Sequence, residues 1–216
     1  MLVALLIFIV LLLLRVPISF VLGITTIVYI ILSNNMGLLA SAPQRLYSAL
    51  ESYGLLAIPL FMMAGELMNS GGITKRLIDF SKTLVGHFRG GLAYVNVLSN
   101  MMLASIIGSA TAQIAMMSRV MVPSMEKEGY SREFSASTTA TAGLLGPIIP
   151  PSMMFIIYGV TSGTSIGAMF LAGILPGILF AAAIVILIAL IGMKQKWPTQ
   201  ERAPIPEMLK SFFRVI

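Results

Sequence analysis

The chain has 216 residues, of which 57% are hydrophobic and only 10% are charged. Soluble domains carry about 25% charged residues, so this composition predicts an integral membrane protein. The absence of cysteine excludes disulfides, thiolate catalysis and cysteine-based metal sites. The net charge of +6 comes mostly from lysine and arginine between apolar runs, which is typical of cytoplasmic loops and gives no support to nucleic-acid binding.

Six runs of the chain are nearly free of charged residues, and about 20 residues of apolar helix cross a bilayer. None of these runs alternates between apolar and polar residues as a membrane-spanning strand does. We therefore expect an all-α, polytopic membrane protein whose apolar runs are residues 1–14, 16–33, 54–68, 91–118, 134–160 and 168–193.

The first two runs are separated by Arg15-Val-Pro17. Proline and charge together predict either a sharp kink in one helix or a junction between two short helices, and the sequence leaves both open. Residues 34–53 are more polar, and we expect a loop there with room for an interfacial helix. Residues 54–68 then return across the membrane and end near a Gly71-Gly72 pair, which suits a helix C-terminus.

Residues 73–87 form an amphipathic segment. Its apolar side chains fall broadly on one helical face, and Lys75, Arg76 and Lys82 lie elsewhere. An amphipathic helix with excess positive charge is expected to lie in the plane of the cytoplasmic interface. Glycine pairs on both sides of it allow hinge-like changes of the backbone. The single histidine, His87, has no other ligand at metal-binding spacing.

The next run, residues 90–125, is too long for one comfortable crossing. If it crossed once, the basic tail beginning at Lys194 would end outside, after the two later runs. If it enters and leaves from the cytoplasm as a re-entrant helical hairpin, both basic segments stay inside. We therefore predict a hairpin over residues 91–125 with its tip near Ser105 to Thr111. This interpretation places Arg119 in the outgoing arm, where it must reach the interface or find a partner.

The segment Thr141-Ala-Gly-Leu-Leu-Gly-Pro-Ile-Ile-Pro-Pro-Ser152 places two glycines and three prolines inside an apolar run. We expect it to interrupt the helix over residues 134–160. Bilayer hydrocarbon has no water to satisfy a broken helix, so freed carbonyls survive only where protein buries them or where they line a polar cavity. The break is therefore a candidate binding site.

The hairpin tip and the break contain no Asp or Glu, which disfavours a proton relay or a divalent metal. Carbonyl and hydroxyl oxygens suit a monovalent cation, and half-helix N-termini suit a carboxylate. Ser105 and Ser109 are four residues apart, so on a helical tip they share a face. The alternative is that these small residues only let membrane helices pack closely.

Several short motifs, in order over residues 1–193, resemble the large membrane subunit of tripartite ATP-independent periplasmic (TRAP) transporters, the DctM-like family. Each motif is weak alone, and as a set they are specific. They are Leu56-Ala-Ile-Pro-Leu-Phe61, Ala64-Gly-Glu-Leu-Met68, Gly71-Gly-Ile-Thr-Lys-Arg76, Gly90-Gly-Leu-Ala-Tyr-Val-Asn96, Gly108-Ser-Ala110, Gly146-Pro-Ile-Ile-Pro-Pro-Ser152 and Leu171-Ala-Gly-Ile-Leu-Pro-Gly177.

The resemblance implies the first inverted repeat of an elevator-type, sodium-coupled importer of an organic acid anion, such as a C4-dicarboxylate or sialic acid. It implies two partners, a small membrane subunit and a periplasmic substrate-binding protein, and a multi-pass location in the lipid bilayer of the bacterial inner membrane. Sodium is the implied coupling ion, with no other cofactor. The implied organisation is scaffold-type helices at 1–70, an interfacial arm at 71–90, a transport-type segment at 91–193 (hairpin 91–125, interrupted helix 134–160, helix 168–193) and, at 194–216, a cytoplasmic linker to a second half beyond this chain.

The family's first sodium site carries over to the hairpin tip and the broken helix, at Ser105, Gly108, Ser109, Gly146, Ile149 and Pro151. Substrate contacts are expected at Thr111, Pro150 and Ser152. Two other functions stay open: another hairpin-containing sodium:anion symporter, and a membrane scaffold that does not transport. An enzyme is disfavoured because no nucleophile with a base, carboxylate pair or metal cluster is visible.

Overall fold

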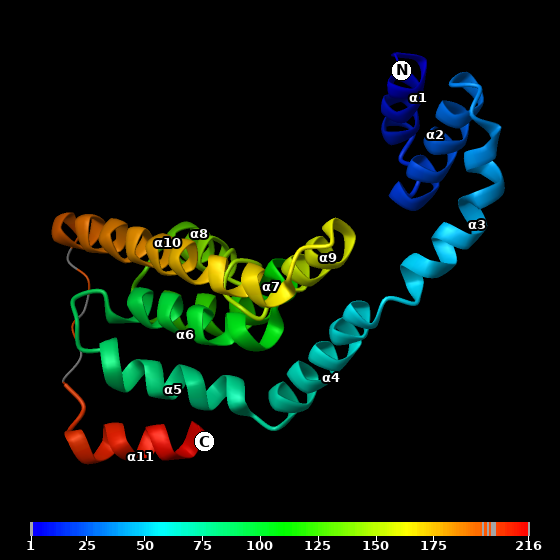
Figure 1. The fold of residues 1–216 in the computed structure, drawn as a ribbon. Coiled ribbons are helices and arrows are strands. Elements are labelled where there is room, and N and C mark those ends of the chain that lie inside the picture. Colours follow the sequence, from blue (N-terminus) through cyan, green and yellow to red (C-terminus); the bar gives the residue numbers. More distant parts are fainter. Residues whose placement is uncertain (1, 196, 198, 200–201, 216) are drawn as a thin grey trace. The chain divides into compact units, whose positions relative to one another are not determined.

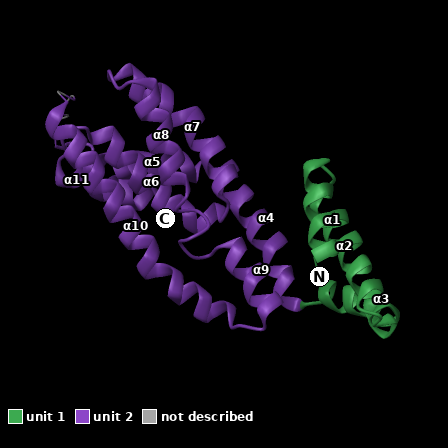
Figure 2. Ribbon diagram, turned by 90° about the horizontal axis from the view of Figure 1, so that it is seen from above, with its two compact units in different colours: residues 1–52 green, residues 53–216 purple. Residues whose placement is uncertain are grey.

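A computed structural model describes residues 2–195, 197, 199 and 202–215. Over this part of the chain every element is helical and no strand forms, as the composition predicted (Figure 1). The chain divides into two compact units, residues 1–52 and residues 53–216 (Figure 2). The segments predicted as a hairpin and a broken helix both lie in the second unit.

The first unit consists of three helices. One helix ends at Leu13 and the next begins at Ile18, so the segment around Arg15 is a junction between two helices. Pro17 has no N–H to continue a helix, and Arg15 adopts a left-handed backbone conformation with φ 59°. Most of residues 34–53, where we expected a loop with room for a helix, is helical. The helices are α1 (Leu2–Leu13), α2 (Ile18–Leu32) and α3 (Met36–Leu50).

Most of the apolar helices are shorter than a membrane crossing. Helices α1 and α2 have 12 and 15 residues. At about 1.5 Å per residue they are roughly 18 and 22 Å long, against a hydrocarbon core of about 30 Å. Helix α10 (Ile166–Lys194) has 29 residues and is the one described helix that could cross a membrane by itself, judged by length and composition. The run 134–160, which we expected to be an interrupted helix, is divided into two shorter helices.

The second unit opens with η1 (Tyr53–Leu56), α4 (Ala57–Ser70) and α5 (Ile73–Val85). Helix α5 covers most of the predicted amphipathic segment, and it lies along the following helix with Leu77 and Ile78 buried. Glycine permits the turns at both ends of this segment. Gly72 precedes α5 and Gly90 precedes α6, and both have a left-handed backbone, with φ 78° and 81°.

Helices α6 (Gly91–Ile107) and α7 (Ala110–Lys127) turn back on each other through Gly108 and Ser109. Gly108 takes a left-handed conformation (φ 61°), which ends α6. The packed interior between these helices and their neighbours contains fully buried large side chains, among them Leu92, Leu103, Met117, Met121 and Met125. The pair is a helical hairpin, and its re-entry into a membrane stays a prediction.

The glycine- and proline-rich segment lies between α8 (Arg132–Gly143) and α9 (Met153–Ser162), so the chain is not helical throughout residues 134–160. Ser152 caps α9, because its hydroxyl accepts a hydrogen bond from a backbone N–H of the first turn. Helix α10 passes close to the break. At Gly177 of α10 a Cβ would lie 2.7 Å from the Ile149 side chain, so a small residue is needed there.

Residues 194–216, which we expected to be a linker, include a helix, α11 (Ile205–Val215), that lies along α5 (Figure 1). The Arg76 guanidinium donates a hydrogen bond to the Arg214 carbonyl at 3.1 Å, and the ring centroids of Phe80 and Phe212 lie 5.7 Å apart. The amphipathic segment is thus partly covered by the chain's own C-terminal helix.

Trp197 joins the two open ends of the α6–α7 hairpin. A Cβ at Gly90 would lie 2.5 Å from its ring, and the Trp197 and Tyr130 ring centroids are 5.2 Å apart. Gly90 precedes α6 and Tyr130 follows α7, so the two ends lie together. Burial, followed by the charge of Glu128, raises the pKa of Tyr130 to about 12, so this aromatic contact stays uncharged.

Candidate functional site

The hairpin tip and the break between α8 and α9 are in contact. At Gly108 a Cβ would lie 3.1 Å from the Pro151 carbonyl oxygen and 3.4 Å from the Met153 amide nitrogen. At Gly146 a Cβ would lie 3.3 Å from the Ser109 carbonyl carbon. The two segments approach closely at these points because both glycines lack a Cβ. Four of the six positions predicted as sodium ligands therefore lie together.

Four helix ends converge where these segments meet. The C-terminal ends of α6 and α8 present carbonyl oxygens, and the N-terminal ends of α7 and α9 present N–H groups. A helix carries partial negative charge at its C-terminal end and partial positive charge at its N-terminal end. The same small region can therefore stabilise a cation and an anion near each other without a charged side chain.

Six carbonyl oxygens of residues 144–151 have no hydrogen-bond donor among the described residues. Three of them, at Gly146, Ile149 and Pro151, belong to positions predicted as sodium ligands. Neighbouring carbonyls are used within the break: that of Gly143 accepts from the Gly146 N–H at 3.1 Å, and that of Leu145 accepts from the Ile149 N–H at 2.8 Å. An unused carbonyl in a partly buried break is available to a cation.

The two serines of the tip do not share a helical face. Helix α6 ends at Ile107, so Ser105 lies in its last turn, whereas Ser109 precedes α7 in an extended conformation. The argument that a four-residue spacing aligns them is wrong, because Gly108 turns the chain between them. The Ser105 hydroxyl donates to the Met102 carbonyl at 2.8 Å, and the Ser109 hydroxyl lies 3.3 Å from that of Thr111.

The three positions at which we expected substrate contacts differ in access. Thr111 is exposed in the first turn of α7, and Pro150 is half-buried in the break. Ser152 is fully buried, and its hydroxyl donates to the Pro147 carbonyl at 2.7 Å. In this structure Ser152 therefore shapes the break, and Thr111 is the one of the three with an accessible side-chain hydroxyl.

A chain of buried amides beside the tip was not predicted from the sequence. Gln113 Nε2 donates to the backbone and side-chain oxygens of Asn100, at 2.6 and 2.9 Å. Asn100 Nδ2 donates to Asn96 Oδ1 at 2.8 Å, and Asn96 Nδ2 donates to Thr139 Oγ1 at 2.7 Å. All four residues are 0% exposed, and they connect α6, α7 and α8. The available signal was that these three amides are the only ones in the charge-free run 91–118.

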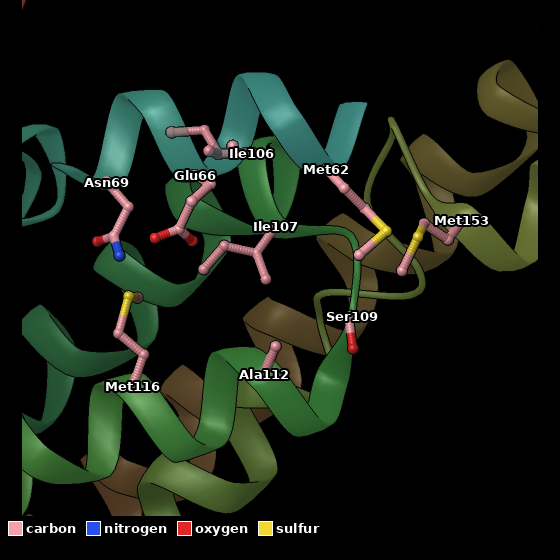
Figure 3. A pocket seen from close by; sticks show the side chains of 10 residues that line it. Met62, Glu66, Asn69, Ile106, Ile107, Ser109, Ala112, Met116 and Met153 are labelled. Atoms are coloured by element: carbon pink, nitrogen blue, oxygen red, sulfur yellow. The ribbon is translucent and has the colours of Figure 1, made fainter. Parts of the chain in front are cut away.

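A cavity of about 340 Å³ lies beside the hairpin tip, between α4, α6 and α7 (Figure 3). Ser109 lines one part of it, and Glu66 and Asn69 of α4 reach into another. Helix α4 comes this close because Gly65 has no Cβ, which would lie 2.8 Å from the Ile106 carbonyl oxygen. Glu66 was not among the predicted site residues, because it lies on a helix outside the tip and the break. The fold brings it into the lining of the cavity beside the tip.

Apolar helices exposed along the described residues, with two breaks that meet in the second unit, are typical of a membrane protein of the helical class. Comparison with known proteins gives the family. Residues 5–216 match the DctM component of tripartite ATP-independent periplasmic transporters, and the chain belongs to this family of permeases.

Three curated relatives illustrate the family. The chain is 38% identical over 195 residues to the sialic acid TRAP transporter large permease protein SiaM of Vibrio cholerae, an alignment that covers 90% of this chain and 45% of that protein. It is 43% identical over 169 residues to the 2,3-diketo-L-gulonate TRAP transporter large permease protein YiaN of Escherichia coli (78% and 40%). It is 38% identical over 167 residues to the C4-dicarboxylate TRAP transporter large permease protein DctM of Pseudomonas aeruginosa (77% and 39%). The chain thus spans less than half the length of each relative.

Proposed function

We propose that this chain forms part of a sodium-coupled importer of an organic acid anion that works by an elevator mechanism. The observation that carries the proposal is the meeting of four helix ends with unused carbonyls at Gly146, Ile149 and Pro151. Such a site offers neutral oxygen ligands, so it favours a monovalent cation over a divalent one. A bound cation keeps its positive charge close to the N-terminal ends of α7 and α9, where it favours binding of a carboxylate.

The names of the relatives support an organic acid as substrate, since they mention sialic acid, 2,3-diketo-L-gulonate and C4-dicarboxylates. Thr111, exposed in the first turn of α7, is our candidate for a contact with the carboxylate. Glu66 lines the neighbouring cavity and repels anions, so that cavity suits a hydrated cation better than the substrate. From the tripartite character of the family we also propose a small membrane subunit and a periplasmic binding protein as partners, in the bacterial inner membrane.

The energy available from sodium favours more than one coupling ion. One sodium ion moving down a tenfold gradient supplies roughly 1.4 kcal/mol, and with a monoanionic substrate it leaves no net charge for the membrane potential to act on. Two ions supply about 5 kcal/mol at 100 mV, which corresponds to accumulation of several thousandfold rather than about tenfold. We therefore propose that the site in this chain works with a second sodium site in the complete transporter.

Sodium dependence of uptake tests the proposal. In the full-length transporter reconstituted with its partners, we expect Ser105→Ala and Ser109→Ala to raise the half-saturating sodium concentration several-fold, because each removes a candidate oxygen ligand. Ser124→Ala is the matched control, since its hydroxyl also bonds a backbone carbonyl but lies near the other end of α7. If both tip variants keep the wild-type value, the serine hydroxyls are not ligands. Wild-type uptake that does not depend on sodium would reject the proposed coupling itself.

The position of the hairpin ends in the membrane is a second expected result. Arg89 and Lys127 stand at the two open ends of the α6–α7 pair, which Trp197 holds together. We expect cysteines placed at either position to react with an impermeant thiol reagent from the cytoplasmic side only, because positively charged segments remain in the cytoplasm. Labelling of the two positions from opposite sides would exclude a re-entrant hairpin.

A further inference from the structure

The amide chain between Gln113 and Thr139 has a fixed direction. Gln113 must point Nε2 toward Asn100, because the two oxygens that it meets there are acceptors. Asn100 Nδ2 must then point toward the oxygens of Asn96, and Asn96 Nδ2 toward Thr139, whose hydroxyl donates to the Ser135 carbonyl at 2.8 Å. Every donor along the chain points toward the open end of the hairpin. The amide chain therefore ends, near the hairpin tip, in a single acceptor atom, Gln113 Oε1.

Gln113 Oε1 is buried and has no hydrogen-bond donor among the described residues, and the whole residue is 0% exposed. This oxygen faces Gly146, where a Cβ would lie 2.8 Å from it. The same point is 3.3 Å from the Gly143 carbonyl oxygen and 3.3 Å from the carbonyl carbon of Ser109. A buried acceptor is costly unless a donor or a cation binds it. The Gly143 carbonyl already accepts from the Gly146 N–H at 3.1 Å, and the Ser109 carbonyl accepts from the Gln113 N–H at 3.0 Å, so Oε1 is the unused oxygen at this point.

We propose that Gln113 Oε1 is a ligand of the coupling cation, on the side of the site formed by Gly146. This inference rests on the proposed sodium coupling and adds a side-chain ligand to the backbone carbonyls. An amide oxygen is a hard, neutral ligand of the kind that such a cation prefers. The hydrogen bonds along the chain polarise one another, which increases the negative charge on the terminal oxygen. Asn100 is the positioning residue, because its backbone carbonyl accepts from Nε2 and so keeps Oε1, and not Nε2, directed at the site.

The test measures sodium binding without transport. The full-length protein is purified in detergent, and its thermal unfolding midpoint is recorded as sodium chloride replaces choline chloride at constant ionic strength, since a ligand of the folded state raises the midpoint. We expect Gln113→Met, which has similar length but no acceptor oxygen, to raise the half-saturating sodium concentration by about tenfold or more. Gly146→Ala places a methyl group 2.8 Å from Oε1 and is expected to have the same effect.

Thr139→Val is the matched control. It removes the far end of the amide chain but leaves Gln113 Oε1 in place, so it is expected to lower the midpoint without sodium and to leave the half-saturating concentration unchanged. If Gln113→Met and Gly146→Ala also keep the wild-type half-saturating concentration, Gln113 is structural and the inference fails. Where Gln113→Met does not yield folded protein, Gly146→Ala decides, because an unchanged half-saturating sodium concentration in that variant rejects the inference. If sodium and choline act alike on the wild-type protein, the proposed sodium coupling fails, and the ligand assignment with it.

Discussion

We expect Gly91→Ala to lower the free energy of unfolding by about 3 kcal/mol or more, because the added Cβ would overlap the backbone carbonyl of Gly86. A carbonyl in the backbone cannot rotate away as a flexible side chain can, so the turn between α5 and α6 would have to open. The effect is measured as the thermal unfolding midpoint of the full-length protein in detergent.

Gly72→Ala is the control for Gly91→Ala. Gly72 precedes α5 and has a left-handed backbone (φ 78°), but no atom outside its immediate neighbours lies within 4 Å of its Cβ position. We expect it to cost roughly 1–2 kcal/mol, from backbone strain alone. Equal destabilisation by the two substitutions would show that the contact with Gly86 is not a determinant of stability. The comparison also bears on the hypothesis that the glycine pairs beside α5 act as hinges. Alanine at Gly91 disturbs packing as well as backbone freedom, so a loss of transport in that variant is not evidence of a hinge.

We expect Gly108→Ala to reduce sodium-dependent uptake by roughly a hundredfold, because a displacement of about 1 Å is enough to disrupt a binding or transport site. Gly108 has φ 61°, and a Cβ would lie 3.1 Å from the Pro151 carbonyl oxygen and 3.7 Å from the Ser152 Cα. Alanine must therefore strain the turn and push the hairpin tip away from the break. Uptake is measured with the transporter reconstituted in vesicles at saturating substrate and limiting sodium.

Gly163→Ala is the control for this effect. Gly163 ends α9 with almost the same backbone conformation (φ 71°), but nothing lies within 4 Å of its Cβ position. It therefore reproduces the backbone strain of the Gly108 substitution without the contact between the two breaks. We expect Gly163→Ala to retain most of the uptake. Comparable losses in both variants would mean that backbone strain, and not the approach of tip to break, limits transport.

Much of the candidate site could be located from the sequence because broken backbone has a local signature. Glycine and proline in an apolar run interrupt a helix through their own geometry, so the positions of Gly108 and of the break around Gly146 followed from composition. The alignment of Ser105 with Ser109 failed for the same kind of reason. A helical spacing rule holds only while the helix continues, and Gly108 ends it.

The amide chain and the cavity could not be located in this way. Asn100 and Gln113 are 13 residues apart, and Glu66 is more than 40 residues from Ser109, so no local rule relates them. Their proximity depends on how α4, α6 and α7 pack, and that packing depends on small residues such as Gly65 that allow close approach.

The sequence by itself determined the class of this protein, an all-helical membrane protein, because the hydrophobic composition and the helix-breaking residues act locally. It also determined the family, because short motifs in a fixed order can be recognised without knowing which residues they contact. Only the tertiary structure decided which polar atoms face the meeting point of the four helix ends. It also decided that residues 205–215 cover α5 and that Gln113 Oε1, rather than a hydroxyl, is the buried acceptor beside Gly146. Such assignments depend on distances between segments far apart in the chain, which packing and hydrogen bonding set together.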